Sequence, residues 1–258
     1  MTKQLEICCG DIASVLAAKE GGANRIELCS GLSEGGLTPS IGLIHSAVDS
    51  GIEQINVLIR PRPGDFLYSE TEVALMENDI RDAIYAGATG VVIGVLTPDG
   101  DVDMDTNSKL ISVAREAAGK VGLKNLNITF HRAFDVSRDP EANLKNIIAL
   151  GCNCLLTSGA APSAVKGLPL ISKLVNQADG KILIMAGSGI NPSNAAEIIA
   201  ATGVKAIHAT ARKPIPSKMR FRRPLVSMGV PGSDEYAPLS TSPDVVAKLL
   251  RIINTTIS

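Results

Sequence analysis

The feature that most constrains the fold is a unit that recurs along the whole chain. Each unit has a short apolar strand, a polar loop, an amphipathic helix and a turn into the next strand, and the strands are predicted at residues 5–9, 26–29, 55–59, 91–96, 126–131, 154–157, 182–185 and 206–210. Regular alternation of strands and helices requires parallel strands joined by right-handed crossovers. About eight such units in roughly 250 residues are typical of the α/β class in its (β/α)8 form, the TIM barrel.

Capping signals place several of the helices between these strands. Ser69-Glu-Thr-Glu72 is a capping box, and Asp139-Pro140 opens another helix with an aspartate cap and a proline in the first turn. We also expect Thr38 to cap the second helix, Asp105 to cap the fourth, and the helix after the sixth strand to cover residues 163–178.

A doubly wound open sheet is the alternative architecture. Such a sheet normally carries a glycine-rich phosphate-binding turn after its first strand, and Cys9-Gly10-Asp11 does not fit that pattern. No linker or break in composition divides the chain, so residues 1–258 are predicted to form a single TIM-barrel domain. Two connections, 30–39 and 212–241, are longer than usual and should lie over the C-terminal face of the barrel.

Composition excludes several classes of function. The formal net charge is −1, so no overall field favours binding to nucleic acid or to an anionic membrane. Aromatic residues make up 3% of the 258 residues and tryptophan is absent, which argues against a surface on which bases stack. The sequence shows neither a signal-peptide pattern nor an apolar run long enough to span a bilayer, and we expect a cytoplasmic location.

The chain has five cysteines, an odd number that argues against a disulfide framework in a cytosolic protein of this size. A free cysteine is most often a small buried apolar side chain, and that interpretation is open for each of them. The cysteines are Cys8, Cys9, Cys29, Cys152 and Cys154.

Polar side chains gather at the carboxyl ends of the predicted strands. In a parallel barrel these ends meet at one face, where the active sites of TIM barrels lie. Burying so many charged groups is costly unless they are paired or used. The set comprises Glu6, Cys8, Glu27, Cys29, Asn56, Arg60, Thr129, His131, Arg132, Thr157, Ser158, His208 and Arg212.

The first hypothesis for this set is a soft metal site. The pattern Glu-x-Cys occurs on the first two strands, so Cys8 and Cys29 should converge if these strands are neighbours. Soft sulfur ligands select Cu(I), which accepts as few as two of them, whereas structural zinc normally takes four ligands. The alternative is that the two cysteines simply fill the barrel interior.

The second hypothesis is acid–base catalysis on a small anionic or carbonyl substrate. Carboxylates beside a histidine and arginines can hold separate pKa values and divide the acid and base roles. A structural ion pair between a glutamate and an arginine is the alternative for any single member. The candidate catalytic residues are Glu6, Glu27, Arg60, His131 and Arg132, and His208 is expected to be a core histidine.

The third hypothesis is a phosphate or other anion held near the last strands, where TIM barrels frequently bind one. A glycine-rich turn follows the seventh strand, and its backbone N–H groups precede a helix that opens at Asn191-Pro192. A tight turn that simply requires glycine is the alternative. The candidate anion-binding residues are Ser158, Gly187, Ser188, Gly189 and Arg212.

At these residues the sequence resembles the CutC family of copper homeostasis proteins, and the resemblance covers nearly the whole chain. One departure occurs at Gly187-Ser-Gly-Ile190, where the family usually has Gly-Gly-Gly-Ile. The resemblance rests on Glu6-Ile-Cys8, Gly22-Ala-Asn-Arg-Ile-Glu-Leu-Cys-Ser-Gly-Leu-Ser-Glu-Gly-Gly36, Ile59-Arg-Pro-Arg-Pro-Gly-Asp-Phe-Leu-Tyr68, Thr129-Phe-His-Arg-Ala-Phe-Asp135, Leu156-Thr-Ser-Gly159 and Met219-Arg-Phe-Arg222.

The resemblance implies a (β/α)8 barrel, a cytoplasmic location, a homo-oligomer (dimer or tetramer) and Cu(I) binding by Cys8 and Cys29. Two functions therefore compete for the same strand ends. One is a copper-homeostasis protein that binds Cu(I). The other is a TIM-barrel lyase, isomerase or hydrolase that acts on a small anionic or phosphorylated metabolite.

Overall fold

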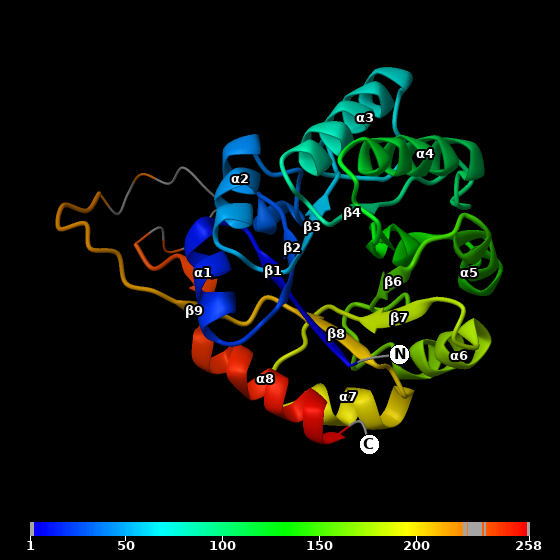
Figure 1. Cartoon of the computed structure of the whole chain (residues 1–258). Coiled ribbons are helices and arrows are strands. Elements are labelled where there is room, and N and C mark those ends of the chain that lie inside the picture. The colour runs from blue at the N-terminus through cyan, green and yellow to red at the C-terminus, as the bar shows by residue number, and fades with distance from the viewer. Residues whose placement is uncertain (1–2, 224–225, 227–233, 235, 257–258) are drawn as a thin grey trace.

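A closed barrel of eight parallel strands forms the centre of the molecule in a computed structural model (Figure 1). The structure describes residues 3–223, 226, 234 and 236–256. The strands follow one another around the barrel in chain order, and β8 closes on β1, as the sequence predicts for a (β/α)8 barrel. They are β1 (Gln4–Cys9), β2 (Arg25–Leu28), β3 (Gln54–Leu58), β4 (Gly90–Ile93), β5 (Asn127–Phe130), β6 (Cys154–Thr157), β7 (Leu183–Ala186) and β8 (Ala206–Ala209).

Helices surround the barrel and cover its outer surface (Figure 1). The outward-facing strand residues, such as Ile7, Ile26 and Val57, pack against the apolar faces of these helices in one continuous core. The α-helices are α1 (Ile12–Glu20), α2 (Ile41–Asp49), α3 (Glu70–Tyr85), α4 (Met104–Lys120), α5 (Pro140–Ala149), α6 (Leu168–Ala178), α7 (Ala195–Thr202) and α8 (Pro243–Thr256).

Some predicted helix starts are confirmed and others are wrong. The Ser69 capping box opens α3, and Asp139 caps α5. Thr38 does not cap α2, because its hydroxyl accepts a hydrogen bond from the backbone N–H of Arg60 at 2.9 Å and ties the loop to the end of β3. Ser40 caps α2 instead.

The other two corrections have similar local causes. Asp103, not Asp105, caps α4, since its carboxylate accepts from the backbone N–H of Thr106 and Asp105 lies in the first turn. Helix α6 begins at Leu168 rather than at residue 163, after a turn in which Gly167 packs against the backbone of Ser158. At that position a Cβ would lie 1.9 Å from the carbonyl oxygen of Ser158, so only glycine fits.

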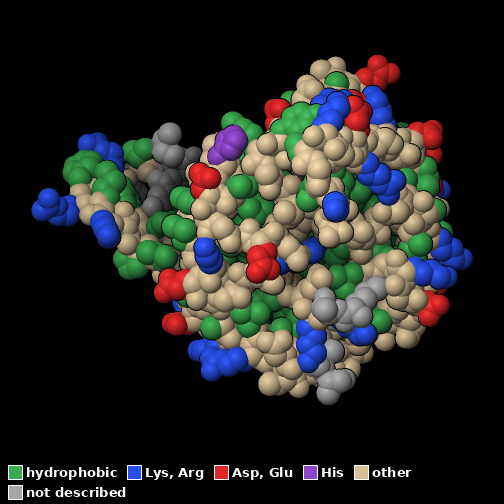
Figure 2. Space-filling model, viewed as in Figure 1, with side chains coloured by type: hydrophobic (Ala, Val, Ile, Leu, Met, Phe, Trp, Pro, Cys, Tyr) green, Lys and Arg blue, Asp and Glu red, His purple; other side chains and the backbone are tan. Residues whose placement is uncertain are grey.

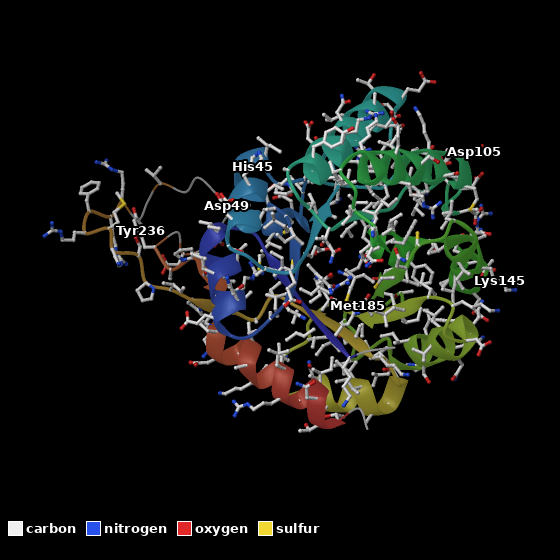
Figure 3. The ribbon with its side chains drawn as sticks, in the orientation of Figure 1. His45, Asp49, Asp105, Lys145, Met185 and Tyr236 are labelled. Atoms are coloured by element: carbon white, nitrogen blue, oxygen red, sulfur yellow. The ribbon has the colours of Figure 1, made fainter. Side chains whose placement is uncertain are left out.

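The side chains inside the barrel form one polar layer and separate apolar clusters. The layer near the middle is a buried ion pair: Glu6 accepts hydrogen bonds from Arg25 at 2.7 Å and from Asn56 at 2.8 Å. Asn127 then donates to Asn56 at 3.0 Å. Apolar side chains fill other parts of the interior, and Met185, which is labelled in Figure 3, lies there while Asp105 and Lys145 lie on the outside.

The connection between β8 and α8 is not a simple loop. Its ends pair as two short antiparallel strands, β9 (Arg212–Pro214) and β10 (Leu239–Thr241), and residues 215–223, which follow β9, project away from the barrel beside α1 (Figure 1). Residues 224–225, 227–233 and 235 lie outside the described residues. Of the described residues in 212–241, Arg212 is the one that lines the cavity at the barrel mouth.

The projecting segment is both basic and apolar on its surface (Figure 2). Met219 and Phe221 are exposed there, as are the basic residues Lys213, Lys218, Arg220, Arg222 and Arg223. Among the described residues, none of the helices combines the length and the apolar character that crossing a bilayer requires.

Candidate functional site

A cavity of about 420 Å³ opens at the C-terminal ends of the strands. This volume falls in the range of about 300–1,000 Å³ that is usual for small-molecule sites. Side chains from the ends of β1, β2, β3, β5, β6 and β8 and from the loops after β7 and β8 form its wall. The polar members are Cys8, Glu27, Arg60, His131, Arg132, Asp135, Ser188, His208, Thr210 and Arg212.

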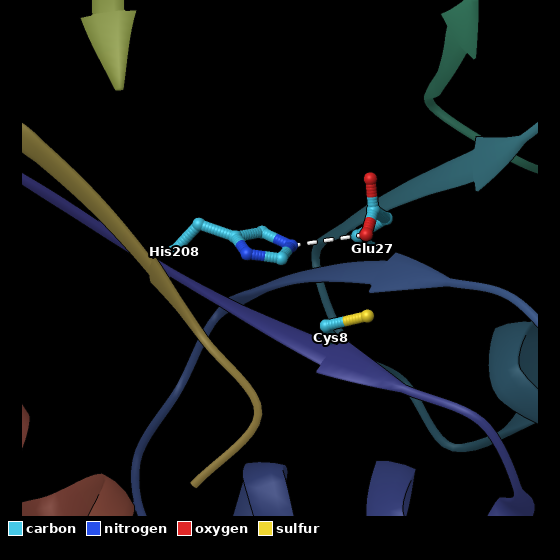
Figure 4. Close-up of side chains that lie close together, drawn as sticks. All are labelled: Cys8, Glu27 and His208. Atoms are coloured by element: carbon cyan, nitrogen blue, oxygen red, sulfur yellow. Dashed lines mark hydrogen bonds and ion pairs between the residues drawn. The ribbon is translucent and has the colours of Figure 1, made fainter. Parts of the chain in front are cut away.

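Glu27 and His208 form a buried pair in this wall (Figure 4). The Nε2 atom of His208 lies 2.9 Å from Oε2 of Glu27, and the two side chains are 12% and 7% exposed. They meet because β8 pairs with β1 on one side and β2 pairs with β1 on the other. Closing the barrel therefore brings together two residues that are 181 positions apart.

The pair stabilises its own charged form. Burial works against a charged carboxylate, but the charge and the hydrogen bond of His208 outweigh it and lower the pKa of Glu27. Burial likewise works against a charged imidazole, and Glu27 outweighs it and raises the pKa of His208. Both shifts favour a carboxylate beside an imidazolium, which is an arrangement that can accept a proton at one group and donate one from the other.

Two thiols lie directly beside this pair. The sulfur atoms of Cys8 and Cys29 are 3.6 Å apart, and both residues are buried. Cys8 lines the cavity and is drawn below Glu27 and His208 in Figure 4, and one possible metal-ligand atom from each of the three residues lies within 4.8 Å of the others. The hydrogen bond with Cys29, together with burial and the charge of Glu27, raises the pKa of the Cys8 thiol well above its ordinary value.

Arg60 is held rigidly at the cavity mouth, at the end of β3, the strand that neighbours β2. Its guanidinium donates to the backbone carbonyls of Glu34, Gly36 and Gly64 at 2.8–2.9 Å. These bonds use Nη1 and Nη2 only. The Nε atom is buried and has no partner among the described residues.

His131 lies beside Arg60, and the two share Phe66 as a packing partner. The imidazole is 5.0 Å from the Phe66 ring, and the Arg60 guanidinium lies 5.1 Å over the same ring. The Nδ1 atom of His131 accepts a hydrogen bond from the backbone N–H of Ala133 at 3.2 Å. An Nδ1 acceptor requires the proton of the neutral ring to be on Nε2.

That proton has no acceptor in the protein, because Nε2 of His131 is buried without a partner among the described residues. Burial lowers the pKa of His131 to about 4; the charge of Glu27 opposes this shift, and that of Arg60 adds to it. At neutral pH the ring is therefore an uncharged donor at the cavity wall.

The end of β4 makes room for this ring. A Cβ placed on Gly94 would lie 2.5 Å from both Cε1 and Nδ1 of His131, closer than real side-chain contacts. The backbone of Gly94 has no positive φ that would itself require glycine. Glycine is needed here for space, so a strand end that offers no polar side chain still positions a neighbouring one.

The turn after β7 lines the cavity and has backbone N–H groups without partners among the described residues. Ser188 and Gly189 have φ values of 76° and 75°, so two consecutive residues of this turn are in the left-handed region. The N–H groups of residues 188–190 donate no hydrogen bond to another described residue, and all three residues line the cavity. Successive unpaired N–H groups in such a turn form a concave anion-binding surface.

Arg212 lies near this turn, at the start of β9, and its Nε is also buried without a partner among the described residues. The predicted anion-binding set is therefore only partly present at the cavity. Gly187 lies below the turn, where a Cβ would meet Leu156 at 2.6 Å. Ser158 is fully buried and bonds to Asp135 rather than facing the cavity.

Asp135 fastens the end of β6 to the loop after β5. Its carboxylate accepts from the hydroxyl of Thr157, from the backbone and hydroxyl of Ser158 and from the backbone of Ala160. Arg132 completes the cluster with bonds of 2.8 Å to Asp135 and 3.0 Å to Ser158. Arg132 lines the cavity, but these partners occupy two of its three nitrogens.

The predicted catalytic set divides in the structure. Glu27, Arg60, His131 and Arg132 line one cavity. Glu6 does not line it, since it is buried in the layer below, where Arg25 and Asn56 bind its carboxylate. This is the structural ion pair that the sequence left open as the alternative.

His208 is the site residue that sequence reasoning underestimated. The signal for it was present, because His208 ends the last strand and a closed barrel makes the last strand a neighbour of the first. Phe66 entered the sequence analysis only as part of the family motif and was given no role, since the loop that carries it has no regular structure from which its direction could be inferred.

The structure is that of a TIM-barrel protein with a cavity lined by ionisable groups at the C-terminal ends of its strands. The chain belongs to the CutC family, whose family model matches residues 3–213. A CutC family protein of Chromobacterium violaceum is 46% identical over 249 residues, which are 96% of this chain and 97% of that protein. The corresponding protein of Bacteroides thetaiotaomicron is 44% identical over 98% of this chain and 96% of its own length.

Solved structures agree with the fold. The crystal structure of a protein from Streptococcus agalactiae, named as a copper homeostasis protein CutC, superposes with a TM-score of 0.73 at 31% identity, covering 81% of this chain and 99% of that chain. Thiamine phosphate pyrophosphorylase from Pyrococcus furiosus superposes with a TM-score of 0.57 at 19% identity, covering 99% of this chain and 97% of that one. The second likeness shows the shared barrel alone.

Proposed function

We propose that the cavity carries out general acid–base chemistry on a small anionic metabolite, with Glu27 and His208 as the proton-transferring pair. The observation that carries this proposal is the 2.9 Å contact between these two ionisable groups in the wall of a 420 Å³ cavity. Glu27 is the base, and the protonated His208 is the acid. Buried neighbours whose pKa values are moved apart are the usual means of dividing these roles.

The charge of the substrate follows from the other side chains of the wall. Arg60, Arg132 and Arg212 all line the cavity, and each brings a guanidinium to its wall. A cavity that concentrates positive charge between low-dielectric walls attracts anions. One of these arginines is partly neutralised by Asp135, which leaves Arg60 and Arg212 as the main attraction.

Proton transfer can be detected without knowing the reaction. The protein is incubated in D₂O with a panel of small phosphorylated and carboxylated metabolites, and proton NMR follows solvent deuterium entering carbon positions or any conversion of the compound. We expect the wild type to act on at least one member of the panel and Glu27→Gln to be slower by about 10²–10⁴-fold, the usual contribution of a general base.

The matched control is Glu116→Gln, which removes a carboxylate that pairs with Lys120 on the surface of α4. This variant should exchange at the wild-type rate. The proposal is wrong if compounds bind in the cavity but neither exchange nor conversion occurs, or if Glu27→Gln is as active as the wild type.

A second function, Cu(I) binding by Cys8 and Cys29, is favoured by one specific observation: the 3.6 Å separation of their sulfur atoms inside the barrel mouth. Two thiols suit the low coordination number and soft character of Cu(I), so the residues present fit this ion. The thiols must lose protons to bind it. Because the pKa of Cys8 is raised, Cu(I) affinity should increase with pH.

A competition assay with a Cu(I) chelator under anaerobic, reducing conditions tests this function. We expect the wild type to take up one Cu(I) and the Cys8→Ser/Cys29→Ser variant to take up none. Cys152→Ser is the control, since Cys152 is buried below the barrel, away from the mouth. Equal binding by the wild type and the double variant would exclude the site.

We further propose a cytoplasmic location and a homo-oligomeric state. Five free cysteines suit a reducing compartment. Exposed Met219 and Phe221 on the projecting segment supply apolar surface for contact between copies, and sedimentation equilibrium of the purified chain would give the number of copies.

A further inference from the structure

Three buried side-chain nitrogens around the mouth cavity lack a hydrogen-bond partner within the described part of the chain. They are Nε of Arg60, Nε2 of His131 and Nε of Arg212. All three are donors. A buried donor without a partner costs about 1–3 kcal/mol, so groups of this kind in one cavity indicate a ligand that supplies acceptors.

The donors fall into two groups on different sides of the mouth. Arg60 and His131 end β3 and β5, are 6% and 5% exposed, and pack on the same ring, Phe66. Arg212 follows β8, next to the turn after β7, where residues 188–190 line the cavity and their N–H groups have no partner in the described structure. Glu27 on β2 and His208 on β8 line the same cavity as these two sets of donors.

The two groups suit different chemical functions. The turn at residues 188–190 and Arg212 together offer several N–H donors and one full positive charge, which match the three oxygens of a phosphate. His131, with Nδ1 already accepting from Ala133, offers a single N–H from a neutral ring. A neutral donor beside a fixed arginine suits an uncharged oxygen that gains negative charge during reaction.

We propose that the natural ligand is a short carbonyl compound with a terminal phosphate: Nε2 of His131 and Nε of Arg60 receive its carbonyl oxygen, and residues 188–190 and Arg212 receive its phosphate. This inference rests on the proposed acid–base function and adds the substrate class to it. In such a complex Glu27 removes a proton from the carbon next to the carbonyl. The C–H electron pair forms a new C=C bond and the π pair of the carbonyl moves onto its oxygen. The proton is then on Glu27, and His131 and Arg60 stabilise the oxygen of the enolate.

Binding of four defined probes to the wild type tests the proposal without any variant. Dihydroxyacetone phosphate has both groups, glycerol 3-phosphate lacks the carbonyl, dihydroxyacetone lacks the phosphate, and hydroxypyruvate replaces the phosphate with a carboxylate. Isothermal titration calorimetry should show dihydroxyacetone phosphate binding at least about tenfold more tightly than each of the other three. Equal affinity for dihydroxyacetone phosphate and glycerol 3-phosphate, or no binding of any probe, would overturn the proposal. Tighter binding of hydroxypyruvate would overturn the assignment of phosphate.

Two variants then assign the groups to their residues. Arg212→Met should weaken both phosphorylated probes by about tenfold and leave the ratio between them unchanged. His131→Leu should remove the preference for the carbonyl compound, and His131→Gln, which keeps an N–H donor, should restore part of it. A carbonyl preference that survives in His131→Leu would contradict the role of that residue.

These binding results are independent of catalysis. If the protein prefers the probe with both the carbonyl and the phosphate but catalyses no deuterium exchange, the ligand class is supported and the acid–base function is excluded. If a carbonyl compound exchanges deuterium but binds no more tightly than its analogue without the carbonyl, catalysis is supported and this ligand class is excluded.

Discussion

The neutral state of His131 is a property of one residue that can be measured directly. The side chain is almost fully buried, and its pKa falls to about 4 from an ordinary value of 6.5. The folded protein therefore resists protonation of a group that the unfolded chain protonates readily. Since the folded-state pKa is the lower one, this contribution to stability is complete above pH 6.5 and is lost as pH falls toward 4.

We predict that His131→Leu changes the pH dependence of unfolding. At roughly 1.4 kcal/mol for each pKa unit, the wild type should lose about 3 kcal/mol between pH 7 and pH 4 through this histidine, and the variant should not. Urea unfolding of both proteins at a series of pH values measures the difference. Parallel curves for the two proteins would show that His131 titrates normally when folded.

Asp135 is a single residue on which the stability of the fold depends. It is 5% exposed and accepts hydrogen bonds from Thr157, Ser158 and Ala160 as well as from Arg132. An asparagine of the same shape would replace one acceptor oxygen with an NH2 donor that faces these donors. We predict that Asp135→Asn lowers the free energy of unfolding by about 2–4 kcal/mol.

Urea unfolding of Asp135→Asn at neutral pH measures this loss. Asp65→Asn is a suitable comparison, because Asp65 also pairs with an arginine three positions away but its side chain is 74% exposed. A surface pair is worth about 0–1 kcal/mol, so that variant should lie close to the wild type. Similar values for the two variants would show that the carboxylate of Asp135 is not needed to hold the end of β6.

At the scale of the element, the end of β4 shows how a strand can contribute by offering no side chain. Gly94 leaves the space in which the His131 ring lies. We predict that Gly94→Ala displaces this ring, destabilises the fold by about 1–3 kcal/mol and weakens any ligand that bonds to Nε2. The stability loss is measured by urea unfolding, and the movement of the ring by the imidazole signals of His131 in an NMR spectrum.

The chain offers a matched glycine for this experiment. Gly119 lies within α4, and a Cβ there would meet nothing within 4 Å. Gly119→Ala should stabilise the protein by about 0.5–1 kcal/mol, the usual gain of alanine over glycine in a helix. Unchanged His131 signals in Gly94→Ala would mean that the ring does not depend on the space at Gly94.

The elements were predictable from the sequence to different degrees. The predicted bounds of β6, 154–157, are those of the structure, and most other strands were predicted to within a residue or two. Short apolar runs between helices mark the strands because the strand side chains that face the helices are buried. The starts of the helices were predicted less accurately. Thr38 and Asp105 are good capping residues, but their roles depended on contacts with β3 and on the position of Asp103.

The site was predictable where the sequence itself set the register. Cys8 and Cys29 converge because two neighbouring strands carry the same pattern. By contrast, the separation of Glu6 from Glu27 into different layers depends on the stagger of the strands around the barrel, which local sequence does not specify. The partner of Glu27 depended on closure of the barrel through β8.

At the scale of the whole molecule, the barrel separates a layer that supports the fold from a layer that faces the cavity. Glu6, Arg25 and Asn56 are joined by hydrogen bonds in the supporting layer, and none of them lines the cavity. Glu27, His131 and His208 lie above them and line it. Changes in the supporting layer should therefore alter stability more than ligand affinity.

The buried pair of Glu6 and Arg25 provides the test. Both side chains are almost fully buried, so removing one leaves the other as an isolated charge in a low-dielectric interior. We predict that Glu6→Leu costs about 3–5 kcal/mol in the free energy of unfolding, whereas Glu6→Leu/Arg25→Met costs clearly less than this single change. The reason is that the double variant leaves no unpaired charge, although it loses the same ion pair.

Urea unfolding of the wild type, the single variant and the double variant completes this comparison, with Glu116→Ala as a surface control that should change stability by less than about 0.5 kcal/mol. The double variant, if it is folded, should also retain the affinity for the cavity ligand to within about twofold, because the changed layer does not touch the cavity. A double variant that is less stable than the single variant would show that the pair itself holds the strands together. A large loss of ligand affinity in a folded double variant would show that the two layers are coupled.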